Sequence, residues 1–205
     1  MRDMVYKKKL KVGLDFDGVV AYNPFRIVRA PIAWWKRHVL GEKRLSFYYP
    51  TNALTKLMWT VLHDSSVFPA KGVGLLQTMV EEGIIDVHLI TARYSFLDDH
   101  LDRWLRKHKL TTLFTSININ HRDEQPHIFK SRLVEQYKLD YYIEDNLDIV
   151  RHITQQLPIG TTHPTKIFWI YNVIDRAYPH PHKFPYLQKA LEEIMRISKL
   201  DKLVK

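Results

Sequence analysis

The chain contains no cysteine, which excludes disulfide bonds and metal sites built on thiolates. It also has no stretch approaching the roughly 18 consecutive apolar residues that a membrane-spanning helix needs. The basic N-terminus is not followed by the apolar segment of a secretory signal. From these absences we expect a soluble, cytoplasmic protein that has no membrane partner.

Acidic residues are outnumbered, with 22 Asp and Glu against 31 Lys and Arg, so the formal net charge is +9. A positive field attracts phosphate esters and nucleic acids. The basic residues are spread along the chain, however, which is more typical of a solvated surface than of a nucleic-acid site. The 205 residues, 45% of them hydrophobic, suit one folded domain or one domain with an insertion.

Short apolar runs alternate with amphipathic stretches along most of the chain. The runs predict five strands, at residues 11–16, 84–90, 113–119, 140–143 and 167–171. Helices are predicted from Pro69 to Gly83, over 98–108, from Pro126, through Leu147, Val150 and Ile153, and over 186–203. Such alternation predicts an α/β fold with a parallel sheet and helices on both faces.

Residues 21–68 do not show this alternation of apolar runs and amphipathic stretches, because prolines and aromatic residues interrupt it. After Asn52, a typical helix N-cap, the spacing of Leu54, Leu57, Met58 and Val61 is helical. We interpret 21–68 as a small helical insertion that forms no strands. The core is then made of residues 1–20 and 69–205.

The aromatic residues of the insertion allow two interpretations. For the tryptophans Trp34, Trp35 and Trp59, packing in the core of the insertion is favoured over stacking on a substrate, because aromatic side chains are more often part of a packed core. Three further aromatic residues fall in a predicted loop and are better candidates for stacking on a substrate: Phe47, Tyr48 and Tyr49.

Two aspartates end the first predicted strand, in the sequence Asp15-Phe16-Asp17-Gly18. Residues two apart on a strand share a face, so Asp15 and Asp17 converge if the chain stays extended. Two carboxylates on the same face of a strand, two residues apart, repel each other unless a cation or a proton lies between them. An isolated pair of this kind would be best interpreted as a solvated acidic turn, but matching motifs follow downstream.

Three further motifs follow in order. Thr91-Ala92-Arg93 comes after the second strand, Lys130 lies at the start of the helix before the fourth strand, and Glu144-Asp145 ends that strand. Ligands of doubly wound sheets bind beyond the carboxyl ends of the strands, where all these motifs lie. Taken singly, Thr91 could instead cap a helix, Lys130 could be a surface lysine, and Arg93 could pair with a helix carboxylate.

The four motifs together resemble those of the haloacid dehalogenase-like (HAD) phosphohydrolase superfamily, over residues 11–171. The resemblance implies a doubly wound, Rossmann-like sheet of five strands in the order 3-2-1-4-5. It also implies that the insertion is a cap over the site. The stretches Leu-Ile-Thr-Ala-Arg, Trp-Leu-Arg-Lys-His and Ile-Glu-Asp-Asn are most similar to the 5′(3′)-deoxyribonucleotidase-like branch of the 5′-nucleotidases.

Physical chemistry supports the same kind of site. A phosphate dianion repels an attacking carboxylate, and Mg²⁺ held by oxygen ligands cancels that repulsion. Asp15 would then be the nucleophile, and Asp17 would protonate the leaving group and later deprotonate water. The metal ligands would be Asp15, Asp17, Asp145 and Glu144. The phosphate would be bound by Thr91, Ala92, Arg93 and Lys130.

One departure from the family pattern concerns Glu144, which stands where many members have a second aspartate. Its longer side chain leaves open whether Glu144 or Asp145 reaches the metal.

The sequence therefore predicts a Mg²⁺-dependent phosphatase of small phosphate monoesters, with nucleoside monophosphates preferred. A phosphatase of sugar phosphates or of nucleic-acid 3′ ends is an alternative. A non-catalytic nucleic-acid-binding module is a further one, although the carboxylates would repel nucleic acid.

Overall fold

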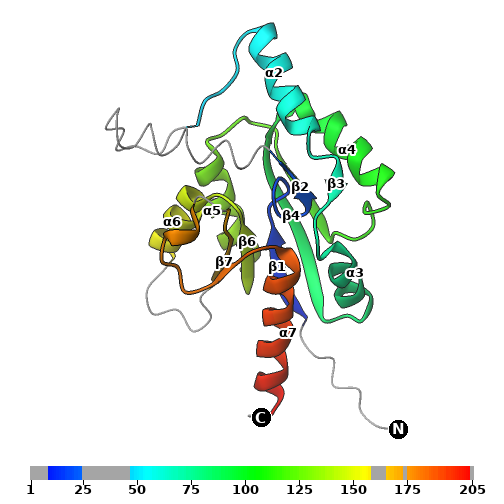
Figure 1. Ribbon diagram of the computed structural model, residues 1–205, viewed down its shortest axis with the longest axis vertical. Coiled ribbons are helices and arrows are strands. Elements are labelled where there is room, and N and C mark those ends of the chain that lie inside the picture. The colour runs from blue at the N-terminus through cyan, green and yellow to red at the C-terminus, as the bar shows by residue number, and fades with distance from the viewer. Residues whose placement is uncertain (1–8, 25–46, 158–164, 173–174, 204–205) are drawn as a thin grey trace.

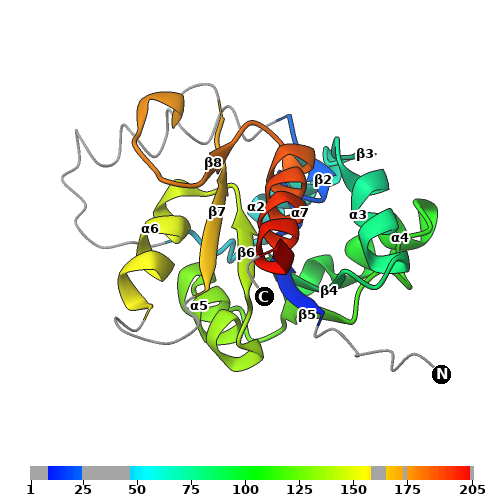
Figure 2. The same ribbon diagram turned by 90° about the horizontal axis from the view of Figure 1, so that it is seen from below.

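The computed structural model describes residues 9–24, 47–157, 165–172 and 175–203 (Figure 1). At its centre lies a parallel sheet, and helices cover both faces (Figures 1 and 2). Among these residues, no helix combines the length and the apolar character needed to cross a membrane.

The sheet has six strands, one more than predicted. They are β1 (Leu10–Leu14), β4 (Ile85–Tyr94), β5 (Ser116–Asn120), β6 (Tyr141–Glu144), β7 (Lys166–Ile170) and β8 (Lys183–Phe184). Their spatial order is β5-β4-β1-β6-β7-β8, and all neighbours are parallel. Numbered along the chain within this sheet, the order is 3-2-1-4-5-6. The predicted sheet lacked β8 because a two-residue strand is too short to show an alternating pattern.

Two layers of helices cover the sheet (Figure 2). One layer consists of α3 (Val73–Glu81), α4 (Asp98–Lys107) and α7 (Leu187–Leu203), and the other of α5 (Pro126–Tyr137) and α6 (Leu147–Gln156). Short 3₁₀ helices η1 (Ser95–Leu97) and η2 (Asp175–Ala177) lie in connections. Each layer has its own apolar core against the sheet. Burial on both faces explains why the central strands are apolar runs in the sequence.

The insertion contains helix α2 (Ala53–Asp64), which stands above the upper end of the sheet in Figure 1. Asn52 caps it as predicted, since its side chain accepts a hydrogen bond from the Thr55 backbone N–H at 2.8 Å. The prediction that the insertion forms no strands was wrong. β2 (Ala21–Tyr22) and β3 (Phe68–Pro69) pair antiparallel at its base.

Pro69 therefore ends this short pair and does not begin α3. The helix starts four residues later at Val73, after Gly72. A proline is tolerated here because it removes one backbone hydrogen-bond donor, and a two-residue strand forms few hydrogen bonds with its neighbour. Gly83, with φ of +67°, follows the helix end as predicted.

The apolar stripe of α2 is largely exposed. Leu54, Leu57, Met58 and Val61 each expose between 59% and 68% of their surface. Trp59 and His63 lie on a different side of the helix, where His63 is buried. Trp34 and Trp35 lie outside the described residues, and the division of the chain into core and insertion stays a prediction.

Candidate active site

The predicted motifs meet at the carboxyl edge of the sheet. Asp15 directly follows β1, and its backbone N–H donates to the Ile143 carbonyl of β6 at 3.0 Å, which extends the ladder by one residue. Glu144 is the last residue of β6, and Asp145 follows it. The first and fourth motifs are therefore neighbours because β1 and β6 are adjacent strands.

Three buried carboxylates form a cluster at this edge. One oxygen each from Asp15, Glu144 and Asp145 lies within 4.8 Å of the others. The ammonium of Lys130, from the second turn of α5, lies 2.8 Å from Asp15 Oδ1 and 2.8 Å from Glu144 Oε2. With all groups ionised, the cluster keeps two excess negative charges. An oxygen-only, buried and anionic donor set of this kind fits a hard divalent cation such as Mg²⁺.

Burial controls the protonation of this cluster. It raises the pKa of Asp15, with Lys130 opposing the rise and Asp145 adding to it. Burial, together with the Asp15 carboxylate, raises the pKa of Glu144 to about 7. For Lys130 burial acts in the lowering direction, but Asp15 and Glu144 outweigh it and raise its pKa. Lys130 is therefore an ammonium at neutral pH.

Glu144 is held by three hydrogen bonds. Its Oε2 accepts from Lys130 Nζ at 2.8 Å and from the Tyr142 hydroxyl at 2.9 Å, and its Oε1 accepts from the Asn146 backbone N–H at 3.1 Å. Tyr142 was missed by the sequence analysis. Its position two residues before Glu144 on the same strand is a signal that could have identified it.

Asp17 is not one of the three carboxylates of the cluster, although its negative charge contributes to the raised pKa of Asp15, and the chain turns immediately after Asp15. The carbonyl of Phe16 accepts hydrogen bonds from Val20 N at 3.0 Å and from Ala21 N at 2.9 Å. Gly18 has φ of +87°, a conformation that glycine adopts without strain. The chain therefore does not stay extended beyond Asp15 as expected, while the convergence of the two aspartates stays a prediction.

The side chain of Asp17 accepts four hydrogen bonds. Arg93 donates through Nε to Oδ2 at 2.9 Å and through Nη2 to Oδ1 at 2.7 Å. Ser66 Oγ donates to Oδ1 at 2.8 Å, and His63 Nδ1 lies 3.1 Å from Oδ2. Burial by itself raises the pKa of Asp17, but Arg93 and His63 hold it well below its usual range. Asp17 is therefore an ionised carboxylate with its acceptor sites in use.

The second motif lies inside β4 and not beyond its end. Thr91 is buried, and its Oγ1 accepts the backbone N–H of Arg93 at 3.2 Å, while Ala92 is half-buried. Arg93, predicted as a phosphate contact, holds Asp17 and donates to the His63 carbonyl at 2.9 Å. No local pattern marked His63 and Ser66, which are 46 and 49 residues from Asp17 in sequence.

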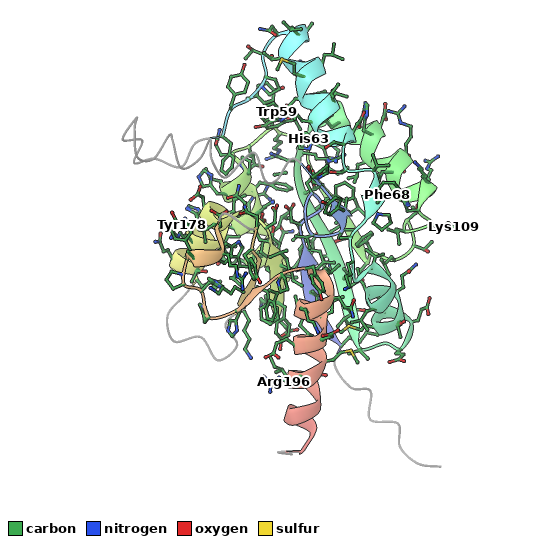
Figure 3. All side chains as sticks on the ribbon, in the orientation of Figure 1. Trp59, His63, Phe68, Lys109, Tyr178 and Arg196 are labelled. Carbon is green, nitrogen blue, oxygen red and sulfur yellow. The ribbon has the colours of Figure 1, made fainter. Side chains whose placement is uncertain are left out.

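The three aromatic candidates for stacking differ in their surroundings. The Phe47 ring packs 6.0 Å from His127, and the Tyr49 ring lies edge-on to Tyr94 at 4.8 Å. Tyr48 is 51% exposed, and its ring lies 5.9 Å from that of Trp59. Figure 3 shows Trp59 and His63 close together on the lower part of α2. Tyr48 is thus the member of the trio whose ring a ligand can reach.

Comparison with known proteins identifies the fold. No family model and no curated protein matches the sequence. YfnB from Bacillus subtilis, provisionally named a HAD-hydrolase and bound to magnesium, matches with a TM-score of 0.56 at 13% identity, covering 93% of this chain and 99% of that one. The chain has the fold of the HAD-superfamily hydrolases.

Two further solved structures show the same fold. A protein from Thermotoga maritima, provisionally named a beta-phosphoglucomutase, has a TM-score of 0.55 at 13% identity and covers 92% of this chain and 99% of its own. CbbY from Rhodobacter sphaeroides, in complex with phosphate, has a TM-score of 0.54 at 10% identity, with coverages of 90% and 100%. At these identities the likeness concerns the fold alone. None of the three is named a nucleotidase, so the branch expected from the sequence gains no support.

Proposed function

We propose that this protein is a Mg²⁺-dependent hydrolase of small phosphate monoesters that acts through an aspartyl-phosphate. The supporting observation is the buried cluster of Asp15, Glu144 and Asp145, with Lys130 between two of its members. Buried carboxylates without a compensating cation are costly, so the cluster is best explained by a function that uses a bound cation.

In the proposed reaction a carboxylate oxygen of Asp15 attacks phosphorus, and the bond between phosphorus and the leaving oxygen breaks. Water then cleaves the acyl phosphate, which releases inorganic phosphate and restores the carboxylate. Lys130 holds Asp15 in place and stabilises charge on the transferring group. Asp15 and Asp145 would hold Mg²⁺, which when bound offsets the repulsion between the carboxylate and the phosphate dianion.

Because Asp17 is ionised in the structure, it is proposed first to take up a proton from water, then to pass that proton to the leaving oxygen, and finally to accept a proton from the attacking water. Its four hydrogen bonds mean that this role requires a change of partners. His63 and Ser66, both from the insertion, are the partners that can be exchanged while the bidentate Arg93 pair stays in place. The insertion would then affect catalysis as well as the shape of the pocket.

The proposed substrates are nucleoside monophosphates. The exposed ring of Tyr48, supported by Trp59, offers a surface on which a planar leaving group can stack. Sugar phosphates and nucleic-acid 3′ ends are the alternatives among substrates. A non-catalytic nucleic-acid-binding role is disfavoured, because three buried carboxylates repel a phosphate backbone in the absence of a cation.

The test is phosphate release from a panel containing nucleoside monophosphates, hexose phosphates and 3′-phosphorylated oligonucleotides, each with Mg²⁺ and with EDTA. We expect release from mononucleotides in Mg²⁺ and none in EDTA. Circular dichroism should show a folded protein in both, because the site side chains extend from preformed strand ends. Turnover of none of these esters would overturn the proposal, and fastest turnover of hexose phosphates or oligonucleotides would replace its substrate.

A further inference from the structure

We propose that Gln125 is a positioning residue that fixes the aromatic surface of Tyr48 relative to the phosphoryl site, and so selects substrates with a planar leaving group. This inference rests on the proposed function. It concerns a residue outside the four motifs, in the connection between β5 and α5.

The side chain of Gln125 pairs with the backbone of a single residue of the insertion. Its Oε1 accepts the Phe47 N–H at 2.8 Å, and its Nε2 donates to the Phe47 carbonyl at 3.3 Å. A side-chain amide that bonds to both the backbone N–H and the backbone carbonyl of one residue acts as a neighbouring strand does. It fixes both the position and the orientation of that residue's backbone. Residue 47 is therefore attached to the core although it lies 78 positions earlier in the chain.

The two residues after Phe47 are also attached to the core. The Tyr94 hydroxyl, at the end of β4, donates to the Tyr48 carbonyl at 2.9 Å. The Tyr49 hydroxyl donates to Asp123 Oδ2 at 3.0 Å. Three consecutive residues are thus held by β4 and by the β5–α5 connection. Between Phe47 and Tyr49, both partly buried, Tyr48 exposes its ring.

Gln125 also belongs to the element that carries Lys130. Its carbonyl accepts the backbone N–H groups of Ile128 at 3.0 Å and Phe129 at 3.1 Å, in the first turn of α5. Lys130 follows five residues later, which is about 7.5 Å along a helix. The amide that holds residue 47 and the ammonium that holds Asp15 therefore come from the same rigid segment.

The ring of Tyr48 has a second support, from Trp59 of the insertion itself. Trp59 lies 5.9 Å from Tyr48 and 6.3 Å from His63, which in turn contacts Asp17 at 3.1 Å. A ring stacked on Tyr48 is thereby related to two parts of the site. The Gln125 support relates it to Asp15 through the helix that carries Lys130, and the Trp59 support relates it to His63.

The experiment compares Gln125→Leu with the wild type on two esters in Mg²⁺, deoxyadenosine 5′-monophosphate and glycerol 3-phosphate. The leaving group of the second ester has no ring to stack. We expect KM for the nucleotide to rise roughly tenfold in Gln125→Leu, with a smaller change in kcat, because two backbone hydrogen bonds that orient the stacking surface are lost. The ratio of kcat/KM for nucleotide over glycerol phosphate should fall by a similar factor.

Gln125→Glu serves as the conservative variant. It keeps the acceptor of the 2.8 Å bond but places a carboxylate oxygen opposite the Phe47 carbonyl in place of the 3.3 Å donor, so it should recover only part of the ratio. Gln155→Leu, at an exposed glutamine of α6, controls for the exchange of glutamine for leucine. Should Gln125→Leu not fold, Gln125→Asn, shorter by one methylene, gives the same comparison.

An unchanged ratio in an active Gln125→Leu variant would overturn the inference alone. An equal loss on both esters would also overturn it, because it would mean that these bonds only hold the fold together. Wild-type protein that is inactive on both esters but active on another member of the panel would overturn this inference, and inactivity on the whole panel would overturn the proposed function as well.

Discussion

Arg93 and Asp17 form a buried, bidentate ion pair in which one guanidinium binds both oxygens of the carboxylate, at 2.9 Å and 2.7 Å. The guanidinium also lies 4.5 Å above the ring of Phe16 and donates to the carbonyl of His63. The pair therefore joins the turn after β1 to β4 and to the end of α2. It fixes the insertion to the core through the residue that is proposed to transfer the proton.

Removing one partner of this pair should destabilise the protein strongly. Arg93→Met leaves Asp17 buried without its guanidinium, and we expect the free energy of unfolding to fall by about 3–5 kcal/mol in urea titrations. The double variant Asp17→Asn/Arg93→Met should recover part of this loss, because no unpaired charge remains. Arg132→Met, at a pair with Glu124 whose arginine is 49% exposed, is the matched control and should change stability by less than about 1 kcal/mol. Equal effects at both sites would contradict the role assigned to burial.

Asp15→Asn should abolish phosphate release while the protein stays folded. A neutral amide cannot form the acyl phosphate, and loss of a nucleophile lowers kcat by several powers of ten. The fold should persist because the Lys130–Glu144 pair remains and the volume is unchanged. Phosphate release and urea unfolding would be measured on the same preparation, and turnover near that of the wild type would exclude Asp15 as the nucleophile.

The roles of Asp145 and Glu144 should separate in Mg²⁺ titrations of activity. Glu144 is already bound by Lys130, Tyr142 and the Asn146 backbone. We therefore expect Asp145→Asn to raise the half-saturating Mg²⁺ concentration by at least about tenfold, in line with the loss of a direct ligand. Glu144→Gln should mainly lower kcat, because Lys130 loses its charged partner. A larger shift in Mg²⁺ requirement for Glu144→Gln would assign Glu144 to the metal instead.

The pKa of Glu144 predicts a pH dependence of stability. Burial raises this pKa from 4.5 to about 7, so the native state binds more protons than the unfolded state in this interval. The stabilisation is present in full below the unfolded pKa and is lost as the pH rises through the folded pKa. In EDTA, the free energy of unfolding of the wild type relative to Glu144→Gln should therefore fall by about 2–3 kcal/mol between about pH 5 and pH 8.

This difference isolates Glu144 from the histidines, whose contributions cancel between the two proteins. Urea titrations at several pH values would measure it. A difference that stays constant would show that Glu144 titrates normally in the native protein, and one that grows with pH would show that its pKa is lowered; either result would contradict the prediction.

Tyr48→Ala and Phe47→Ala should have different effects. Tyr48 exposes its ring, so its loss should lower kcat/KM for mononucleotides by about 1–3 kcal/mol of lost stacking and leave stability nearly unchanged. Phe47 packs on His127 and the core beneath α5 and α6, so its loss should mainly lower the melting temperature. Kinetics on a mononucleotide and thermal unfolding of both variants would distinguish them, and a reversed pattern would exchange the two roles.

Much of the site could be predicted because its motifs are local. Each motif lies in or next to a strand that is recognisable as an apolar run, or in the helix before one: Asp15, Thr91, Lys130, Glu144 and Asp145. Parallel strands bring their carboxyl ends to one edge, so the convergence of Asp15 with Asp145 follows from the order of elements. The sixth strand and the β2–β3 pair could not be predicted, since two-residue strands have no periodicity to detect.

The sequence by itself determined the class of fold, the edge at which the motifs meet and the anionic, oxygen-only character of the cluster. These depend on periodicity and residue type, which are properties of neighbouring positions. Only the tertiary structure decided which partners each carboxylate has. After the turn at Phe16, Asp17 is bound by Arg93, 76 residues away in the chain, and Glu144 is bound by Tyr142 and Lys130. Hydrogen bonds form only within about 3 Å, so partners distant in the chain are selected by packing and not by sequence spacing.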